Sequence, residues 1–194
     1  SEGAINRFRL VAPSPDGALH ERDLRLHEYL TIVAATSYKQ RLRKTIEYFH
    51  ADRLHYAVVG TPNRLEYDLG FFVKNGDGSA DVKPIAHLYK TQVYAMARHL
   101  GLPERLCSAQ PTTDTYSLEQ GQDEFYFALP HAQMDLALWA LNHGRPAAEL
   151  AAALGIGEAA AQAVYDDIAA KRRTTAYLHR PPVLVEPVPE PHRH

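Results

Sequence analysis

The sequence of 194 residues has one cysteine, Cys107, so it can form neither an internal disulfide nor a thiolate metal cluster. It has no apolar run near the roughly 20 residues that span a bilayer, and no signal-peptide pattern. Neither sign of charge is in excess, because 21 Lys and Arg residues face 23 Asp and Glu residues. That balance argues against a globally basic nucleic-acid binder. We expect a cytoplasmic protein with no membrane and no nucleic-acid partner.

Metal-binding motifs and an initiator methionine are missing as well. The eleven histidines are scattered singly, without an H-E-x-x-H or C-x-x-C pattern to gather them. The chain starts with Ser1 rather than Met, which hints at a processed, truncated or engineered start.

Most of the chain has a helical pattern. Apolar residues spaced i, i+4 and i+7 predict a long helix over about 22–49. Similar patterns, with glycine and proline at their ends, predict further helices over about 88–100, 130–142, 146–154 and 158–178. Weak alternation over 5–12 ends in a run of turn formers, and the short apolar run at 56–60 predicts a buried parallel strand. Residues 181–194 contain five prolines, so we expect an extended or disordered tail.

The segment after residue 60 combines a strand end, a turn and a helix start. Thr61 is placed to cap this helix and Pro62 suits its first turn. In open α/β sheets ligands bind beyond the carboxyl ends of strands, where helix N-termini point. The Thr61 hydroxyl and the Glu66 carboxylate would suit a nucleotide and its Mg²⁺ there. On pattern alone, Thr61 is equally explained as a simple cap and Glu66 as a solvated acid.

Residues 75–79 are rich in glycine and form the strongest loop signal in the chain. Lys74 and Asp81 bracket this loop, and Gly76 and Gly78 would let the backbone approach a ligand closely. Lys90 opens the next helix, where its ammonium group could meet phosphates. The alternative is a surface turn with a solvated lysine and aspartate, followed by a lysine on a solvated helix face.

Residues 147–164 suggest a helix-turn-helix, with small residues in the first helix and a glycine turn. Lys171, Arg172 and Arg173 add a short basic run. A DNA-binding interpretation remains an alternative, although any short helical hairpin produces this pattern.

Taken in order, these segments resemble NAD synthetase. The resemblance covers about residues 25–182 and is densest from Gly60 to Val93. It is carried by Arg41, Val59-Gly60-Thr61, Glu66, Leu69-Gly70-Phe71-Phe72-Val73-Lys74, Gly76-Asp77-Gly78, Asp81, Pro84, Leu88-Tyr89-Lys90-Thr91-Gln92-Val93, Pro111-Thr112, Lys171-Arg172-Arg173 and Pro181-Pro182. The family's phosphate loop, S-G-G-x-D-S, does not occur in the sequence.

The resemblance implies the C-terminal part of a Rossmann-like, parallel-sheet ATP pyrophosphatase fold, of α/β class and mostly helical in this segment. Residues 1–180 would form the C-terminal portion of the synthetase domain, without its phosphate-loop half. The family uses ATP and Mg²⁺ to adenylate the nicotinate carboxylate of deamido-NAD⁺, and ammonia then displaces AMP to give NAD⁺. The residues contain no glutaminase segment, which favours ammonia as the direct nitrogen donor, whether free or derived from glutamine elsewhere.

The family's roles carry over to matching positions. Glu66 would hold Mg²⁺, whereas Thr61, Lys90 and Thr112 would contact ATP. The residues that would contact deamido-NAD⁺ are Arg41, Lys74 and Asp81, and the resemblance also implies a homodimer. Without its phosphate loop the isolated chain should be inactive. A non-catalytic binding or dimerisation remnant of the same fold is the alternative.

Overall fold

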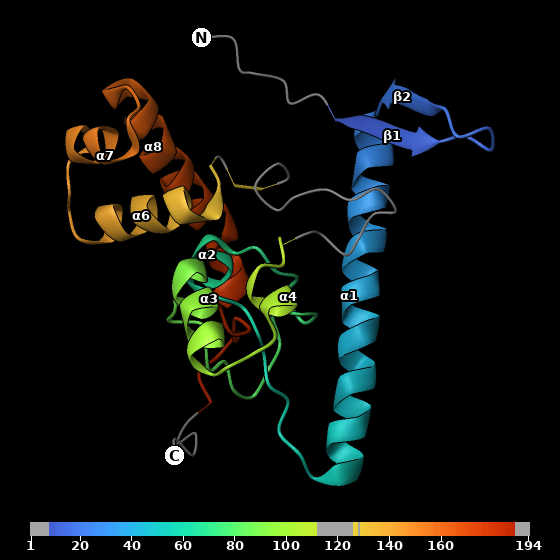
Figure 1. Ribbon diagram of the computed structural model, residues 1–194. Coiled ribbons are helices and arrows are strands. Elements are labelled where there is room, and N and C mark those ends of the chain that lie inside the picture. Colours follow the sequence, from blue (N-terminus) through green and yellow to red (C-terminus); the bar gives the residue numbers. More distant parts are fainter. Residues whose placement is uncertain (1–7, 112–125, 128, 189–194) are drawn as a thin grey trace.

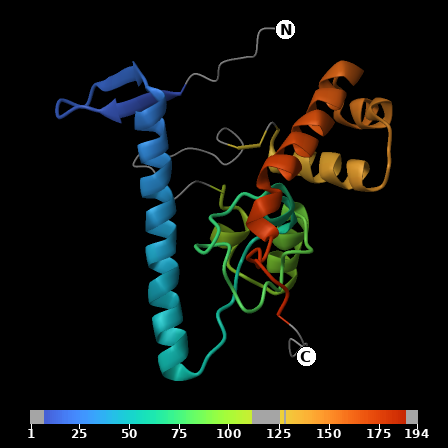
Figure 2. The same cartoon turned by 180° about the vertical axis from the view of Figure 1, so that it is seen from behind.

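The computed structural model describes residues 8–111, 126–127 and 129–188. It consists of a helical body and a long helix, α1 (Leu26–Leu54), which stands beside the body in both views (Figures 1 and 2). A two-stranded hairpin, β1 (Arg9–Pro13) and β2 (Leu19–Asp23), lies at the N-terminal end of α1. The body contains α2 (Arg64–Leu69), α3 (Lys90–His99), α4 (Glu104–Cys107), α6 (His131–Asn142), α7 (Ala147–Leu154), α8 (Glu158–Thr175) and the 3₁₀ helix η1 (Ala176–His179).

The hairpin corrects the predicted start of the long helix. Residue 22 lies in β2, which pairs antiparallel with β1, and α1 starts only at Leu26. Glu28 stabilises this start, because its side chain accepts a hydrogen bond from the backbone N–H of Arg25 at 2.8 Å. The helix also runs past the predicted end at 49 and stops at His55, which has a left-handed conformation. The apolar period located the helix, but strand pairing and capping set its limits.

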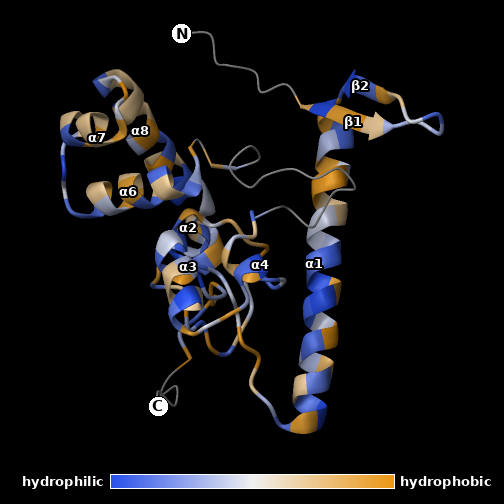
Figure 3. Ribbon diagram, in the orientation of Figure 1, coloured by the Kyte–Doolittle hydropathy of each residue, from blue (hydrophilic) through white to orange (hydrophobic). Residues whose placement is uncertain are grey.

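α1 is poorly covered along its whole length. Of its 29 residues only Lys44 and Ala51 are buried, and hydrophobic residues are visible on both of its halves (Figure 3). We call the exposed residues Leu26, Leu30 and Val33 the inner stripe, and the exposed residues Tyr38, Leu42, Ile46 and Phe49 the outer stripe.

The two stripes face different sides of α1. The inner-stripe residues lie 18 positions before Lys44, Tyr48 and Ala51, which is about five helical turns, so they are on the side of α1 that meets the body. Leu42 and Ile46 are two residues from Lys44 on either side, and so lie on the opposite side.

The hydrophobic core lies where α6, α7 and α8 pack together with α2. Its fully buried members include Leu69, Met134, Leu138 and Ile168. Residues 147–164, the suggested helix-turn-helix, form α7 and the first part of α8, and they bury their apolar faces in this core. Packing therefore accounts for the apolar pattern of that segment.

The expected strand at 56–60 is reduced to one parallel bridge, between Val59 and Val82. Backbone N–H groups of Gly60 and Asp81 donate to the carbonyls of Val82 and Val58, at 2.7 and 2.9 Å. Val58 is buried, as predicted, but Val59 is 56% exposed. Among the described residues the only sheet is the β1–β2 hairpin.

Two further expectations concern the tail and membranes. Residues 181–188 contain no helix or strand, and 189–194 lie outside the described part of the chain. None of the described helices is long and apolar enough to cross a membrane.

Candidate functional site

The first group of candidate residues lies at the start of α2. The helix is capped by Asn63, whose Oδ1 accepts hydrogen bonds from the N–H groups of Leu65 and Glu66 at 2.9 and 3.2 Å. The prediction that Thr61 caps this helix is therefore wrong. Asn63 is 3% exposed and buries its amide where these donors satisfy it, whereas Thr61 is exposed in the segment before it.

Glu66 completes the cap from within the helix. Its Oε2 accepts from the N–H of Asn63 at 2.9 Å, which forms the reciprocal half of a capping box. The carboxylate is half-buried. The sequence had left Glu66 as a Mg²⁺ ligand or a solvated acid, and its capping role was not predicted. The cap uses one carboxylate oxygen.

The starts of α2 and α3 are tied together. The N–H of Arg64 donates to the carbonyl of Leu88 at 2.8 Å, just ahead of α3. Lys90, the first residue of α3, lies with its Nζ 5.6 Å from the ring centre of Tyr94. Burial, and then the charge of Glu66, raise the pKa of the Tyr94 hydroxyl. Glu66, Lys90 and Tyr94 thus form one group, which we call the α2–α3 cluster.

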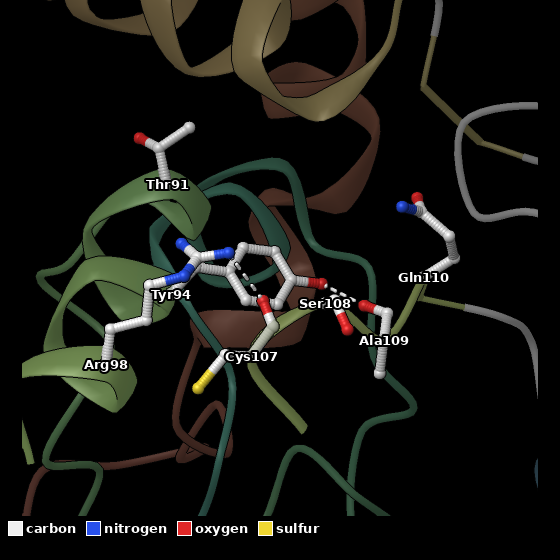
Figure 4. Close-up of a pocket in the computed structure, with 7 residues that line it drawn as sticks. All are labelled: Thr91, Tyr94, Arg98, Cys107, Ser108, Ala109 and Gln110. Atoms are coloured by element: carbon white, nitrogen blue, oxygen red, sulfur yellow. Dashed lines mark hydrogen bonds between the residues drawn. The ribbon is translucent and has the colours of Figure 1, made fainter. Parts of the chain in front are cut away.

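A cavity of about 370 Å³ opens beside this cluster (Figure 4). The Tyr94 hydroxyl donates to the carbonyl of Ala109 at 2.6 Å, and Nη2 of Arg98 donates to the carbonyl of Cys107 at 3.1 Å. These bonds attach the segment after α4 to the side of α3. The cavity is lined by Thr91, Tyr94, Arg98, Cys107, Ser108, Ala109 and Gln110.

The cavity has the size of a small-ligand site. Thr112, predicted to contact ATP, follows Gln110 by two residues but lies outside the described residues.

The second group of candidates lies between α1 and the glycine-rich loop. Nε of Arg41 donates to the carbonyl of Lys74 at 3.2 Å. Nζ of Lys74 donates to the carbonyls of Tyr177 and Arg180, both at 2.9 Å. Lys74 therefore connects the loop to the end of the helical body, a contact that sequence reasoning did not anticipate.

Asp81, at the far end of the loop, is held by backbone and side chain. Its Oδ2 accepts from the N–H of Val58 at 2.7 Å. Burial raises the pKa of the Tyr48 hydroxyl, and the neighbouring Asp81 carboxylate, to which it is hydrogen-bonded, adds to the effect. We call Arg41, Lys74 and Asp81, together with Tyr48, the loop cluster. Asp81 is exposed, as the surface-turn alternative has it, but its carboxylate is also bonded to backbone.

The loop itself depends on a glycine. A Cβ at Gly78 would lie 2.3 Å from the ring of Phe72, so only glycine lets the loop fold back this closely. A second cavity, of about 450 Å³, lies between the loop and α1. It is lined by Lys44, Thr45, Tyr48, Phe49, Asp52, Asn75 and Ser79.

Two lysines lie near the loop cluster. Lys44 is 7% exposed and pairs with Glu47. Lys83 lies over the rings of Tyr67 and Phe72. Burial, followed by repulsion from Lys44, lowers the pKa of Lys83. These charges would attract an anionic ligand.

The α2–α3 cluster offers few donors for a divalent cation. The described part of the chain holds no group of three or more His, Cys, Asp or Glu residues that could bind a metal. Glu66 alone provides a hard oxygen donor in the α2–α3 cluster. Mg²⁺ is commonly held by one or two carboxylates together with substrate phosphates, so this single carboxylate fits a shared site and not a closed one.

Sequence reasoning missed three residues that organise these clusters: Asn63, Tyr48 and Asp135. Asn63 follows a proline and was overlooked because Thr61 matched the cap pattern first. Tyr48 lies within the long helical pattern, and nothing in its sequence neighbourhood distinguishes it from the other residues of that helix. Asp135 is a lone acid in an apolar stretch, which was the one available signal of a buried, hydrogen-bonded carboxylate.

Comparison with known proteins places the chain among synthetases. The sequence matches the NAD synthase family over residues 18–177. It is 61% identical over 185 residues to an NH(3)-dependent NAD(+) synthetase of Rhizobium meliloti, covering 95% of this chain and 55% of that protein. The NH(3)-dependent NAD(+) synthetase of Thermotoga maritima is 40% identical over 139 residues, covering 71% of this chain and 48% of that protein. The chain thus spans about half the length of the curated relatives it matches.

Solved structures agree at the level of the fold. The chain is similar to an NMN synthetase from Francisella tularensis, with a TM-score of 0.63 and 20% identity over 79% of this chain and 56% of that one. An NH3-dependent NAD synthetase from Campylobacter jejuni, in complex with nitrate, matches with a TM-score of 0.57 and 20% identity over the same shares.

Proposed function

Because the chain belongs to the NAD synthase family, we propose that it is the C-terminal portion of an ammonia-dependent NAD⁺ synthetase. The upstream half of the fold would contribute the phosphate loop and the rest of a parallel sheet, to which the Val59–Val82 bridge belongs. The nicotinate carboxylate of deamido-NAD⁺ attacks the α-phosphorus of ATP and pyrophosphate leaves. Ammonia then attacks the acyl carbon, AMP leaves, and the amide of NAD⁺ remains.

One observation supports this proposal above the others: the predicted ligand residues separate into two groups, each next to a tyrosine, Tyr94 or Tyr48, that lines a cavity. The α2–α3 cluster contains Glu66 and Lys90, and the first cavity runs from it toward Gln110. The loop cluster contains Arg41, Lys74 and Asp81, and the second cavity adjoins it. Two substrates require two such subsites, and we assign ATP to the first and deamido-NAD⁺ to the second.

Each cluster has a chemical task. The ammonium group of Lys90 offsets charge on the ATP phosphates, and the exposed Thr61 hydroxyl provides a polar contact to ATP. Thr112 joins this subsite by its position in the sequence. Arg41, Lys74 and Asp81 bind and orient deamido-NAD⁺, within the positive field of Lys44 and Lys83. When bound, Mg²⁺ would neutralise phosphate charge, with Glu66 as its carboxylate ligand.

The experiment compares the chain alone with the complete enzyme. The complete enzyme, with the upstream half present, should form NAD⁺ from ATP, Mg²⁺, deamido-NAD⁺ and ammonium. The 194-residue chain should form none, because it lacks the backbone cradle for pyrophosphate and one metal carboxylate. If the complete enzyme is inactive, the chain is a non-catalytic binding remnant. If the isolated chain is active, the phosphate loop is not required.

The stripes on α1 support an assembly with two neighbours. Exposed apolar surface of this extent marks contact sites. The inner stripe continues the side of α1 that meets the body, and we assign it to the upstream half of the same fold. Apart from Phe49, which lines the second cavity, the outer stripe points away from the body, and we assign it to α1 of a second copy in a homodimer.

Oligomeric state tests the assignment of the outer stripe. Leu42 is 47% exposed, and Leu42→Glu should turn the complete enzyme from dimer to monomer in analytical ultracentrifugation. Leu106→Glu, at a residue 52% exposed on α4, is the matched control and should leave the dimer intact. A dimer that survives Leu42→Glu would contradict the assignment.

A further inference from the structure

Asp135 is a buried carboxylate that the proposed reaction does not use. It lies in α6, next to the core residue Met134, and is 5% exposed. Burying a charged carboxylate is costly unless donors satisfy it. Its partners are therefore informative about its role.

Both partners belong to the first turn of α3. Oδ1 of Asp135 accepts from the backbone N–H of Lys90 at 3.2 Å, and Oδ2 accepts from the N–H of Thr91 at 2.7 Å. The cap residue itself, Tyr89, has no side-chain hydrogen bond to these donors. A carboxylate 45 and 44 residues away in the sequence thus caps α3 and compensates the positive end of its dipole.

This arrangement decides how α3 can meet an anion. The N–H groups of Lys90 and Thr91 are already bonded to Asp135, so they are not available to phosphate oxygens. The positive charge that the first turn of α3 offers to a phosphate is then the Lys90 ammonium. Lys90 is held at two points, its backbone by Asp135 and its Nζ over the Tyr94 ring at 5.6 Å.

We propose that Asp135 is a positioning residue for Lys90: by fixing the first turn of α3 on α6, it presents the lysine side chain to the ATP subsite. This inference rests on the proposed function of Lys90. It does not require Asp135 to touch either substrate.

The test uses Asp135→Asn in the complete enzyme. Asparagine keeps the volume and one acceptor oxygen, but it removes the charge and turns an amide NH₂ toward a backbone donor. We expect KM for ATP to rise by roughly tenfold, because misplacing a charged contact weakens the ligand it serves. KM for deamido-NAD⁺ should stay within about twofold.

A double-mutant cycle with Lys90→Ala separates positioning from general stability. If Asp135 acts through Lys90, Asp135→Asn should have no further effect on KM for ATP once Lys90 is alanine. Val164→Ala, which loosens the same core at a 7% exposed residue of α8, is the control. It should lower Tm without raising KM for ATP selectively.

The outcomes are distinct. Equal effects of Asp135→Asn in both backgrounds, or on both substrates, would overturn the proposal and leave Asp135 a purely structural residue. If Asp135→Asn does not fold, Asp135→Glu keeps the charge, displaces it by one methylene, and is measured in the same cycle.

A readout that needs no turnover keeps the two proposals separable. Amide hydrogen exchange in a peptide covering residues 88–95 of the complete enzyme should become faster in Asp135→Asn, since two capped N–H groups lose their partner. If the wild-type enzyme makes no NAD⁺, the proposed function fails. Unchanged exchange in these residues would instead show that Asp135 does not hold α3.

Discussion

The α2–α3 cluster and the loop cluster differ in how the fold holds their residues in position. In the α2–α3 cluster, Glu66 and Lys90 sit in the first turns of two helices that rest on the core, with Leu65 and Leu69 of α2 almost wholly buried. In the loop cluster, Lys74 and Asp81 flank a glycine-rich loop and are held by hydrogen bonds to backbone groups.

Charged side chains are thus held in position in two different ways in this chain. Helix caps fix the first cluster, because a capped first turn leaves little freedom to its residues. Long-range hydrogen bonds to backbone groups fix the loop cluster, because an irregular loop has no regular backbone hydrogen bonds of its own. We expect substitutions in the two clusters to have separable effects.

Glu66→Gln in the complete enzyme should give the largest loss. Glutamine can still accept the capping bond from Asn63, so the cap is preserved while the charge is removed. We expect kcat to fall by roughly a hundredfold or more, with partial recovery at high Mg²⁺. Kinetics across a Mg²⁺ series measure this.

Glu104→Gln is the control, because Glu104 is also a first-turn acid but its side chain is 73% exposed. If the activity of Glu66→Gln equals that of the wild type at every Mg²⁺ concentration, Glu66 has a capping role only.

A two-substrate kinetic matrix tests whether the clusters are separate subsites. Lys90→Ala should weaken the binding of ATP by roughly ten- to a hundredfold, because a charge-assisted contact contributes about 1.5–3 kcal/mol. It will depress kcat instead if the contact forms mainly in the transition state.

Lys74→Ala and Asp81→Asn should raise KM for deamido-NAD⁺ by a similar factor, with a smaller change for ATP. If all three variants shift both substrates equally, the subsite assignment is wrong, and these residues stabilise the fold and do not recognise ligands.

The smallest effect concerns stability alone. Arg172 of α8 donates to both carboxylate oxygens of Asp68 in α2, at 2.6 and 2.9 Å. Arg172→Met should lower the free energy of unfolding by about 1–2 kcal/mol. The loss is modest because Asp68 keeps its ion pair with Arg64. Neither KM should change. Denaturant unfolding measures the change.

Arg173→Met, at the exposed neighbouring residue, should be nearly neutral and serves as the control. A selective change in one KM would place Arg172 in a subsite and not in the structural link between α2 and α8.

Several elements follow from the sequence without the structure. Apolar periods place α1, α3, α6, α7 and α8 within a few residues of their observed bounds, because a buried helix face repeats every turn. The run of turn formers at 12–17 covers the end of β1 and most of the turn of the β1–β2 hairpin, residues 14–18. The family is also readable from the sequence, because motifs between Gly60 and Val93 occur in a fixed order.

Other features were beyond local reasoning. The choice of Asn63 over Thr61 as the cap depended on which side chain the core buries. The strand β2 was not predicted, and its last two residues were assigned to the long helix, because five residues of a hairpin edge carry no strong alternation.

What the sequence by itself determined is most of the helices, which follow from short-range pattern, and the list of ligand-binding candidates, which follows from the resemblance to NAD synthetase. The short helices α4 and η1 were not predicted. Only the tertiary structure decided which candidates share a cluster. It brought the N–H of Arg64 to the carbonyl of Leu88, Lys74 to the carbonyl of Arg180, and Asp135 to the N–H groups of Lys90 and Thr91. These contacts span up to 106 residues of sequence, and no local pattern encodes them, because they arise only when buried apolar faces dock and the polar groups among them must find partners.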